Sequence, residues 1–174
     1  MSTHEGPNPP EGHAAAALHV PAGEGRTTWV AGDAYTIKAL ATQTSGSLSF
    51  FEAVVPPGGG PPLHSHRNED EAFYLLSGDL DMTADGRSFT AHKGDFVFVP
   101  RGARHRFRNV GSADALMLFM YTPGGFERFF LEAGDDPVPG ERPKPWPLDR
   151  VLAVGPLSAA AGMDVYPEDP ETAS

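Results

Sequence analysis

Three histidines and a glutamate form the group of side chains in this sequence best suited to chemistry. His64 and His66 flank Ser65, Glu71 follows five residues later, and His105 lies in a separate stretch. On an extended strand alternate side chains share a face, with Cα atoms about 6.6 Å apart. The rings of His64 and His66 can therefore converge on one ion. An isolated His-x-His pair is weak evidence, because such pairs also occur at ordinary surface positions.

The third histidine lies in a stretch of regular alternation. On a strand, His105 shares one face with Phe107 and Asn109, and three arginines occupy the other face. Those arginines are Arg104, Arg106 and Arg108. They should point away from whatever His105 faces, which predicts a solvated outer surface or a subunit contact.

Three imidazoles and one carboxylate suit a divalent transition metal, namely Fe, Ni, Mn, Co, Cu or Zn. The chain has no cysteine, which excludes thiolate ligands and cysteine nucleophiles. An octahedral ion with four protein ligands keeps two positions open for a substrate oxygen, O2 or water. Glu69 and Asp70 are alternative carboxylates, but the strand phase favours Glu71. We interpret Glu69 as a solvated loop charge in preference to an acid or base beside the ion.

Short strands are expected to position these side chains. Runs rich in β-branched and aromatic residues are separated by turn signals about every 8–12 residues, which favours a sandwich or barrel. Asp85-Gly86 predicts a hairpin turn, and Gly32-Asp33 predicts a turn between the first two strands. The expected strands cover residues 27–30, 35–40, 47–55, 71–76, 79–83, 87–91, 95–99, 104–109 and 115–121.

The chain divides into three expected segments. Residues 1–20 are predicted to be a flexible N-terminal arm, and residues 21–134 a β-barrel with an aromatic helix over residues 125–133. The phenylalanines of that helix predict a lid packed on the barrel. Residues 135–174 are expected to be a proline-rich extended segment with a short helix that starts at Leu148 and is interrupted at Gly155-Pro156.

The composition of the chain limits the kinds of molecule that it is expected to bind. The net charge of −10 argues against a nucleic-acid binder and against binding to anionic membranes. No apolar run approaches the roughly 18–20 residues of a membrane span. We therefore expect a cytoplasmic protein whose partner is a small molecule. Sheet edges and an apolar outer face also predict a homodimer.

The spacing of the histidines, glycines and prolines resembles the two motifs of the cupin superfamily. The first motif is filled by Gly58, His64, His66, Glu71 and Gly78, and the second by Gly94, Pro100, Gly102, His105 and Asn109. The segments PPGGGPPLHSHRNEDEAFYLLSGDL, GDFVFVPRGARHRFRNVG and PGGFERFF are similar to the single-domain bacterial cupins described as quercetin 2,3-dioxygenase-like. Asn109 is interpreted as a partner of a loop and not as a ligand.

The resemblance implies an all-β fold, the double-stranded β-helix or cupin jelly roll, with a short C-terminal helix and an extended tail. It implies that one divalent metal is bound by His64, His66, Glu71 and His105. It further implies a metal-dependent dioxygenase that uses O2 on a small hydroxylated substrate, flavonol-like or otherwise enolisable or phenolic. Glu71 would then be the catalytic base.

The aromatic strand residues predict a pocket for a planar apolar ligand. The expected lining residues are Phe50, Phe73, Phe107, Phe119 and Tyr121. Two alternatives to the dioxygenase stay open: a metal-dependent isomerase, cyclase or decarboxylase without redox chemistry, and a non-catalytic small-molecule-binding protein. The fold alone does not decide among them.

Overall fold

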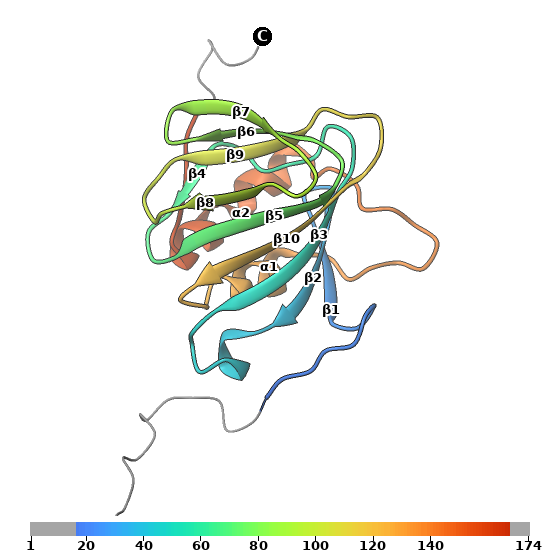
Figure 1. Ribbon diagram of the computed structural model, residues 1–174, viewed down its shortest axis with the longest axis vertical. Helices are drawn as coiled ribbons and strands as arrows, with labels where there is room; N and C mark the ends of the chain where they lie inside the picture. The colour runs from blue at the N-terminus through green and yellow to red at the C-terminus, as the bar shows by residue number, and fades with distance from the viewer. Residues whose placement is uncertain (1–16, 168–174) are drawn as a thin grey trace, which may run out of the picture.

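Two antiparallel sheets form the body of the protein (Figure 1). The computed structural model describes residues 17–167, so most of the predicted N-terminal arm lies outside the described residues. The first sheet has the order β1 (Arg26–Val30), β2 (Asp33–Ala39), β3 (Ser49–Val55), β10 (Ala115–Thr122), β5 (Asp70–Ser77) and β8 (Phe96–Val99). The second has the order β11 (Met163–Val165), β4 (His64–His66), β9 (His105–Asn109), β6 (Leu80–Ala84) and β7 (Arg87–Ala91). The predicted jelly roll is confirmed.

The bounds of the nine predicted strands agree with the structure to within two residues. The hairpin at Asp85-Gly86 is confirmed, and both residues have the positive φ that this two-residue turn requires (51° and 75°). Gly60 allows a close approach just before the first two histidines. A Cβ atom there would collide with the carbonyl oxygen of Phe107 on β9, so only glycine fits.

The core lies between the two sheets, on the inward face of each strand. Burial alternates strictly along β3 and β10, as expected for strands with one face in the core. The rings of Phe51 and Phe119 stack with centroids 4.5 Å apart. The ring of Phe73 lies edge-on to that of Phe107 at 5.9 Å. These aromatic contacts fix the strands that carry the candidate ligands.

The C-terminal segment differs from the expectation. The helix does not stop at Gly155-Pro156, because α2 runs from Leu148 to Ala161 with Pro156 inside it. It is followed by β11, which pairs with β4 and was not predicted. A 3-10 turn at Ala41–Gln43 precedes β3, and α1 (Glu127–Ala133) agrees with the expected aromatic helix. In Figure 1 both α-helices lie together behind the strands.

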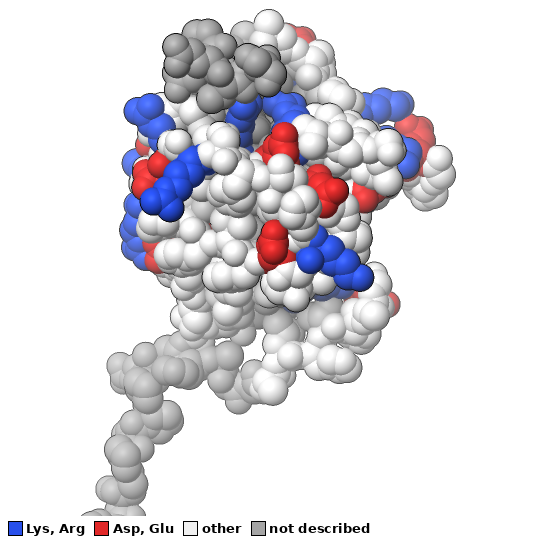
Figure 2. Space-filling model, turned by 45° about the horizontal axis from the view of Figure 1, so that its top comes forward, with Lys and Arg blue, Asp and Glu red and all other residues white. Residues whose placement is uncertain are grey.

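Charged side chains of both signs share the surface. On the face shown in Figure 2, Lys and Arg side chains are interspersed with Asp and Glu. No helix among residues 17–167 is long and apolar enough to cross a membrane. The cytoplasmic location expected from composition stays a prediction.

Candidate metal centre

The first two histidines lie on a strand that is buried along its whole length. β4 has only three residues, His64, Ser65 and His66, and all are buried because β11 covers one edge and β9 the other. The hydroxyl of Ser65 is 3.0 Å from that of Tyr166, which follows β11. The two histidines are in contact, with ring centroids 5.0 Å apart.

The other two candidate ligands come from different strands. His105 is the first residue of β9 and lies directly opposite His64 in the ladder. Glu71 reaches the same point from β5, in the opposite sheet. One ligand atom from each of the four side chains lies within 4.8 Å of the others, and all four residues are buried. The structure thus brings together the four predicted residues.

Backbone carbonyls orient two of the imidazoles. Nδ1 of His64 is 2.8 Å from the carbonyl oxygen of Pro62, and Nδ1 of His105 is 3.0 Å from that of Ala103. A carbonyl can only accept, so each Nδ1 carries the proton and donates it. Nε2 of each ring is then the atom that faces the group. Such a carbonyl contact is a common support for a metal-binding histidine.

A carboxylate occupies the centre of the group. Nε2 of His105 donates to Oε2 of Glu71 across 2.8 Å. Nε2 of His66 lies 3.3 Å from the same oxygen, but without hydrogen-bond geometry. Neither ring nitrogen of His66 has a hydrogen-bond partner among the described residues. A buried imidazole without a partner is unusual in a protein interior and is suited to a metal ion.

The ionisation of two of the four residues, His64 and Glu71, matches what a metal requires. Burial, reinforced by the neighbouring His105 and His66, lowers the pKa of His64 to about 3. Burial would raise the pKa of Glu71, but the hydrogen bond from His105 and the close approach of His66 outweigh it, so the pKa is well below its usual range. Neutral imidazoles and an ionised carboxylate are the forms that bind metals. For His105, contact with Glu71 outweighs burial and raises the pKa, so its Nε2 proton competes with a cation.

The residues present therefore fit one divalent ion. The donor set of three imidazoles and one carboxylate suits transition metals and not the oxygen-preferring Mg²⁺ or Ca²⁺. Asp70 lies outside the group and bonds the Arg101 side chain in a two-pronged contact at 3.0 and 3.1 Å. Of the three neighbouring carboxylates, Glu71 is the one that the structure brings into this group.

Glu69 differs from its interpretation as a solvated loop charge. Its side chain is buried, and Oε2 has no hydrogen-bond partner among residues 17–167. Burial raises the pKa of its carboxyl, against the opposing charges of His66, Arg128 and Arg101. The loop before β5 has a solvent-facing pattern in the sequence, but the C-terminal segment packs on it, since Arg67 bonds the carboxylate of Asp164 and the carbonyl oxygen of Ala159.

A cavity of about 350 Å³ opens beside the four residues. Two of them, His64 and Glu71, line it, whereas His66 and His105 do not. Of the predicted aromatic residues, three line the cavity: Phe107, Phe119 and Tyr121. Its volume lies within the usual range of small-molecule sites.

Two of the predicted pocket residues lie elsewhere. Phe73 is buried between the sheets, against Phe107 and Phe119. Phe50 lies on the outer face of the first sheet, opposite Met120, because its neighbour Phe51 takes the inward position. A shift of one residue along a strand moves a side chain to the other face, and the sequence SFFEAVV did not fix which phenylalanine points inward.

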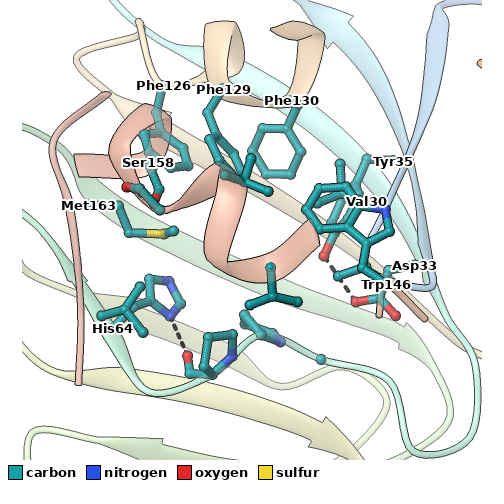
Figure 3. A pocket seen from close by; sticks show the side chains of 18 of the residues that line it. Val30, Asp33, Tyr35, His64, Phe126, Phe129, Phe130, Trp146, Ser158 and Met163 are labelled. Carbon is teal, nitrogen blue, oxygen red and sulfur yellow. Dashed lines mark hydrogen bonds between the residues drawn. The ribbon is translucent and has the colours of Figure 1, made fainter. Parts of the chain in front are cut away.

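The cavity wall formed by the helices and β11 was largely not predicted from the sequence. Phe126, Phe129 and Phe130 on and beside α1 were assigned to a lid, and they line the cavity (Figure 3). Residues of α2 and β11 complete this wall, among them Leu152, Val154 and Met163. Local sequence patterns do not predict such contacts between distant parts of the chain.

A second carboxyl group also lines the cavity. Asp33 was assigned to a turn, but it is the first residue of β2 and its side chain is 2% exposed. Its partner Tyr35 follows two residues later on the same face. The alternation of Asp33, Tyr35 and Ile37 is the signal that could have revealed it. In Figure 3 this pair lies across the cavity from His64.

Comparison with known proteins agrees with this geometry. A family model described as a cupin domain matches residues 51–121. Quercetin 2,3-dioxygenase of Bacillus subtilis is 31% identical over 134 residues, which is 75% of this chain and 39% of that protein. The tetracenomycin polyketide synthase protein TcmJ of Streptomyces glaucescens is 30% identical over 102 residues, or 59% of this chain and 67% of that protein.

A solved structure supports the fold. The crystal structure of a predicted oxalate decarboxylase from Thermotoga maritima has a TM-score of 0.58 and 21% identity, and the match covers 61% of this chain and 99% of that one. The chain spans less than half of the Bacillus dioxygenase, so that protein's activity is not transferred as a whole. The two motifs, the jelly roll, the matching domain model and these relatives together show that the chain belongs to the cupin superfamily.

Proposed function

We propose that this protein is a metal-dependent dioxygenase that acts with O2 on a small hydroxylated aromatic or enolisable substrate. The observation that carries the proposal is the buried group of three histidines and one glutamate at one side of an apolar, aromatic cavity. The 31% identity to quercetin 2,3-dioxygenase supports the oxidative reaction over other cupin chemistries.

The four residues His64, His66, Glu71 and His105 would hold the ion. When bound, a redox-active divalent ion supplies a Lewis acid and a site for O2. The apolar walls bind the flat body of the substrate and exclude water from the reacting end. The strands contribute three aromatic residues to these walls: Phe107 of β9, and Phe119 and Tyr121 of β10.

Glu71 is the side chain that we assign to proton transfer. It lines the cavity and is ionised, which is the form that accepts a proton. A 3-hydroxy-enone substrate loses its hydroxyl proton as it becomes an electron-rich anion, and the carboxylate of Glu71 would receive that proton. The backbone contacts of His64 and His105 keep their rings in place while this happens.

The test uses the full chain loaded separately with Fe(II), Mn(II), Co(II), Ni(II) or Zn(II). We expect 3-hydroxyflavone to be consumed in air with at least one redox-active ion, with one O2 taken up per molecule, and not to be consumed under anaerobic conditions. His92→Ala is the matched control for His105→Ala, because His92 is exposed and bonds Asp79. Turnover that continues unchanged without O2 contradicts the dioxygenase.

A non-redox reaction is the second candidate. It is favoured by the identity to a polyketide synthase protein, TcmJ, of which this chain covers 67%. In that case Glu71 would move a proton on an enolisable polyketide-like substrate without any net oxidation. Product formation by the Zn(II)-loaded protein without O2 uptake would support this reaction and exclude the first one.

We also propose a homodimer formed through the outer face of the first sheet. The edge strand β8 exposes Phe96 and Phe98, and Tyr74 of β5 stands opposite Phe96. Phe50 lies on the same outer face. A second copy of the chain would cover this apolar edge.

Light scattering after size-exclusion chromatography tests the dimer. Phe96→Asp should convert a dimer to a monomer. Phe89→Asp, at an exposed phenylalanine of β7 in the other sheet, should not. A monomeric wild-type protein would contradict the proposal.

A further inference from the structure

The cavity has a polar group at the side remote from the metal ligands. Asp33 and Tyr35 of β2 line it there, and His64 lines it across the opening (Figure 3). Between them the walls are largely apolar, formed by residues such as Val30, Phe130 and Trp146, and the hydroxyl of Ser158 donates to the carbonyl oxygen of Gly155. A ligand that fills the cavity therefore meets one polar group at each side.

Only one of the two carboxyl oxygens of Asp33 accepts a hydrogen bond from a side chain among residues 17–167. Oδ2 accepts a hydrogen bond of 3.0 Å from the hydroxyl of Tyr35. Oδ1 is buried and has no partner with hydrogen-bond geometry among the described residues. The nearby indole N–H of Trp146 is directed to Asp135, at 3.3 Å. A buried polar oxygen without a donor calls for an explanation in a native protein.

The loop before β4 packs its backbone, and no side chain, against this oxygen. A Cβ atom at Gly59 would collide with Oδ1, so no side chain can be placed there. The neighbouring Gly60 and Pro61 line the cavity with backbone and ring atoms. Asp33 itself lines the cavity, so a hydroxyl group of a molecule in the cavity can approach its carboxyl group.

The electrostatics agree with this role. Burial raises the pKa of Asp33 to about 7, even though the Tyr35 hydroxyl, the Gly60 amide and the Arg108 charge lower it. A carboxyl with that pKa accepts a hydrogen bond from a phenol readily and changes protonation state near neutral pH. A residue whose charge is disfavoured by its surroundings does not serve the folded state as a structural ion pair.

We propose that Asp33, held by Tyr35, is a substrate-binding residue that accepts a hydrogen bond from a hydroxyl group at the end of the substrate remote from His64 and Glu71. This inference rests on the proposed function for the other end of the molecule. It narrows the substrate class to flat aromatic compounds with an enolisable hydroxyl at one end and a phenolic hydroxyl at the other. A compound with only the first hydroxyl would leave Asp33 buried without its donor.

Binding of paired probes tests the inference without relying on turnover. The full chain is loaded with Zn(II), and 3-hydroxyflavone, 3,7-dihydroxyflavone and 3,4′-dihydroxyflavone are titrated by calorimetry. We expect at least one dihydroxy compound to bind about tenfold more tightly than 3-hydroxyflavone, because the latter compound leaves the buried carboxyl group without a donor. Asp33→Leu, which keeps the shape and removes the acceptor, should reduce that preference to less than about twofold.

Two further variants make the result specific. Asp33→Asn keeps a neutral acceptor and should retain part of the preference, which covers the case in which the leucine variant does not fold. Asp81→Leu removes an exposed carboxylate of β6 that bonds Thr90, and it should leave the preference unchanged.

Each outcome bears on a defined statement. Equal affinity of the wild type for all three probes, or a preference that survives Asp33→Leu, overturns the role of Asp33. Failure of all three probes to bind overturns this inference and the proposed substrate class together. A preference for a dihydroxy probe that depends on Asp33, without O2 uptake, supports this inference and overturns only the dioxygenase.

Discussion

Two carboxyl groups face the same cavity, and their pKa values are shifted in opposite directions. The side chains of Glu71 and Asp33 belong to residues that are 4% and 2% exposed. Burial disfavours the charge of both, yet the pKa of Glu71 is held well below its usual range and that of Asp33 is raised to about 7. The extent of burial therefore does not determine the sign of the shift.

The neighbours decide the difference. Oε2 of Glu71 is 2.8 Å from Nε2 of His105 and 3.3 Å from Nε2 of His66, and both can carry a positive charge. Asp33 has the neutral hydroxyl of Tyr35 as its hydrogen-bond donor, and Arg108 contributes only the last of the effects that lower its pKa. One side of the cavity is thus built to keep an anion beside a cation, and the other to keep a carboxyl group close to its neutral form.

The strongest test of this contrast removes a ligand. In His105→Ala, the affinity for Co(II) should fall by at least about a thousandfold, since loss of a mere supporting contact already costs about 10–100-fold. The measurement is metal content after dialysis together with calorimetric titration of Co(II). His92→Ala should bind as the wild type does. Full retention of metal by the His105 variant would remove this residue from the site.

The second test replaces the carboxyl group of Asp33, which has no positively charged hydrogen-bond partner within the described part of the chain, by an amide. The folded-state pKa of Asp33 is above its unfolded value of 3.8, so the folded protein holds this proton more tightly. Stability from this proton is present below about pH 4 and is lost as the pH rises through about 7. Asp33→Asn abolishes that loss. The difference in unfolding free energy between the variant and the wild type should therefore shift by about 4 kcal/mol in favour of the variant as the pH rises from 4 to 8, since each pKa unit is worth about 1.4 kcal/mol.

Urea unfolding at the two pH values measures this difference directly. Comparing the two pH values cancels any constant cost of burying the new amide. Asp81→Asn is the control, because the carboxylate of Asp81 is exposed. A gain that is the same at pH 4 and pH 8 would show that the carboxyl of Asp33 does not titrate in the folded protein with a raised pKa.

The smallest expected effect comes from removing the Tyr35 hydroxyl that bonds Asp33. Tyr35→Phe removes the donor to Oδ2 of Asp33, and since that hydrogen bond lowers the pKa of Asp33, its loss should raise the pKa further. A net hydrogen-bond contribution of about 1 kcal/mol corresponds to roughly one pKa unit. Infrared absorption of the protonated carboxyl group across the pH range reports the midpoint. An unchanged midpoint would mean that the hydroxyl does not stabilise the anion.

The two sides of the cavity also differ in how far the sequence predicts them. The four candidate ligands follow from short-range rules, because strand alternation places His64 beside His66 and a turn delivers His105 to the start of its strand. The role expected for Asn109 is confirmed by its donation to the carbonyl oxygens of Val55 and Ala113, at 2.7 and 2.8 Å.

The remaining features depend on contacts between distant parts of the chain. Asp33 reads as a turn residue beside Gly32, and its burial follows only when the loop before β4 and the tail pack over it. A proline inside a helix costs about 3 kcal/mol, so Gly155-Pro156 predicts an interruption. Ser158 and Ala161, which follow the proline, are buried, and this packing favours the continuation of α2 beyond Pro156. Neither effect is encoded in a local pattern.

The pairing of β11 with β4 has a consequence for how new specificities could arise. The strands that carry the four candidate ligands end at Asn109, whereas much of the facing wall comes from α2 and β11, after residue 147. The four candidate ligands and much of the cavity wall that faces them are therefore encoded by separate stretches of the gene. Exchanging α2 and β11 for those of another member offers a way to change the shape of the cavity while keeping the strands that carry the four candidate ligands.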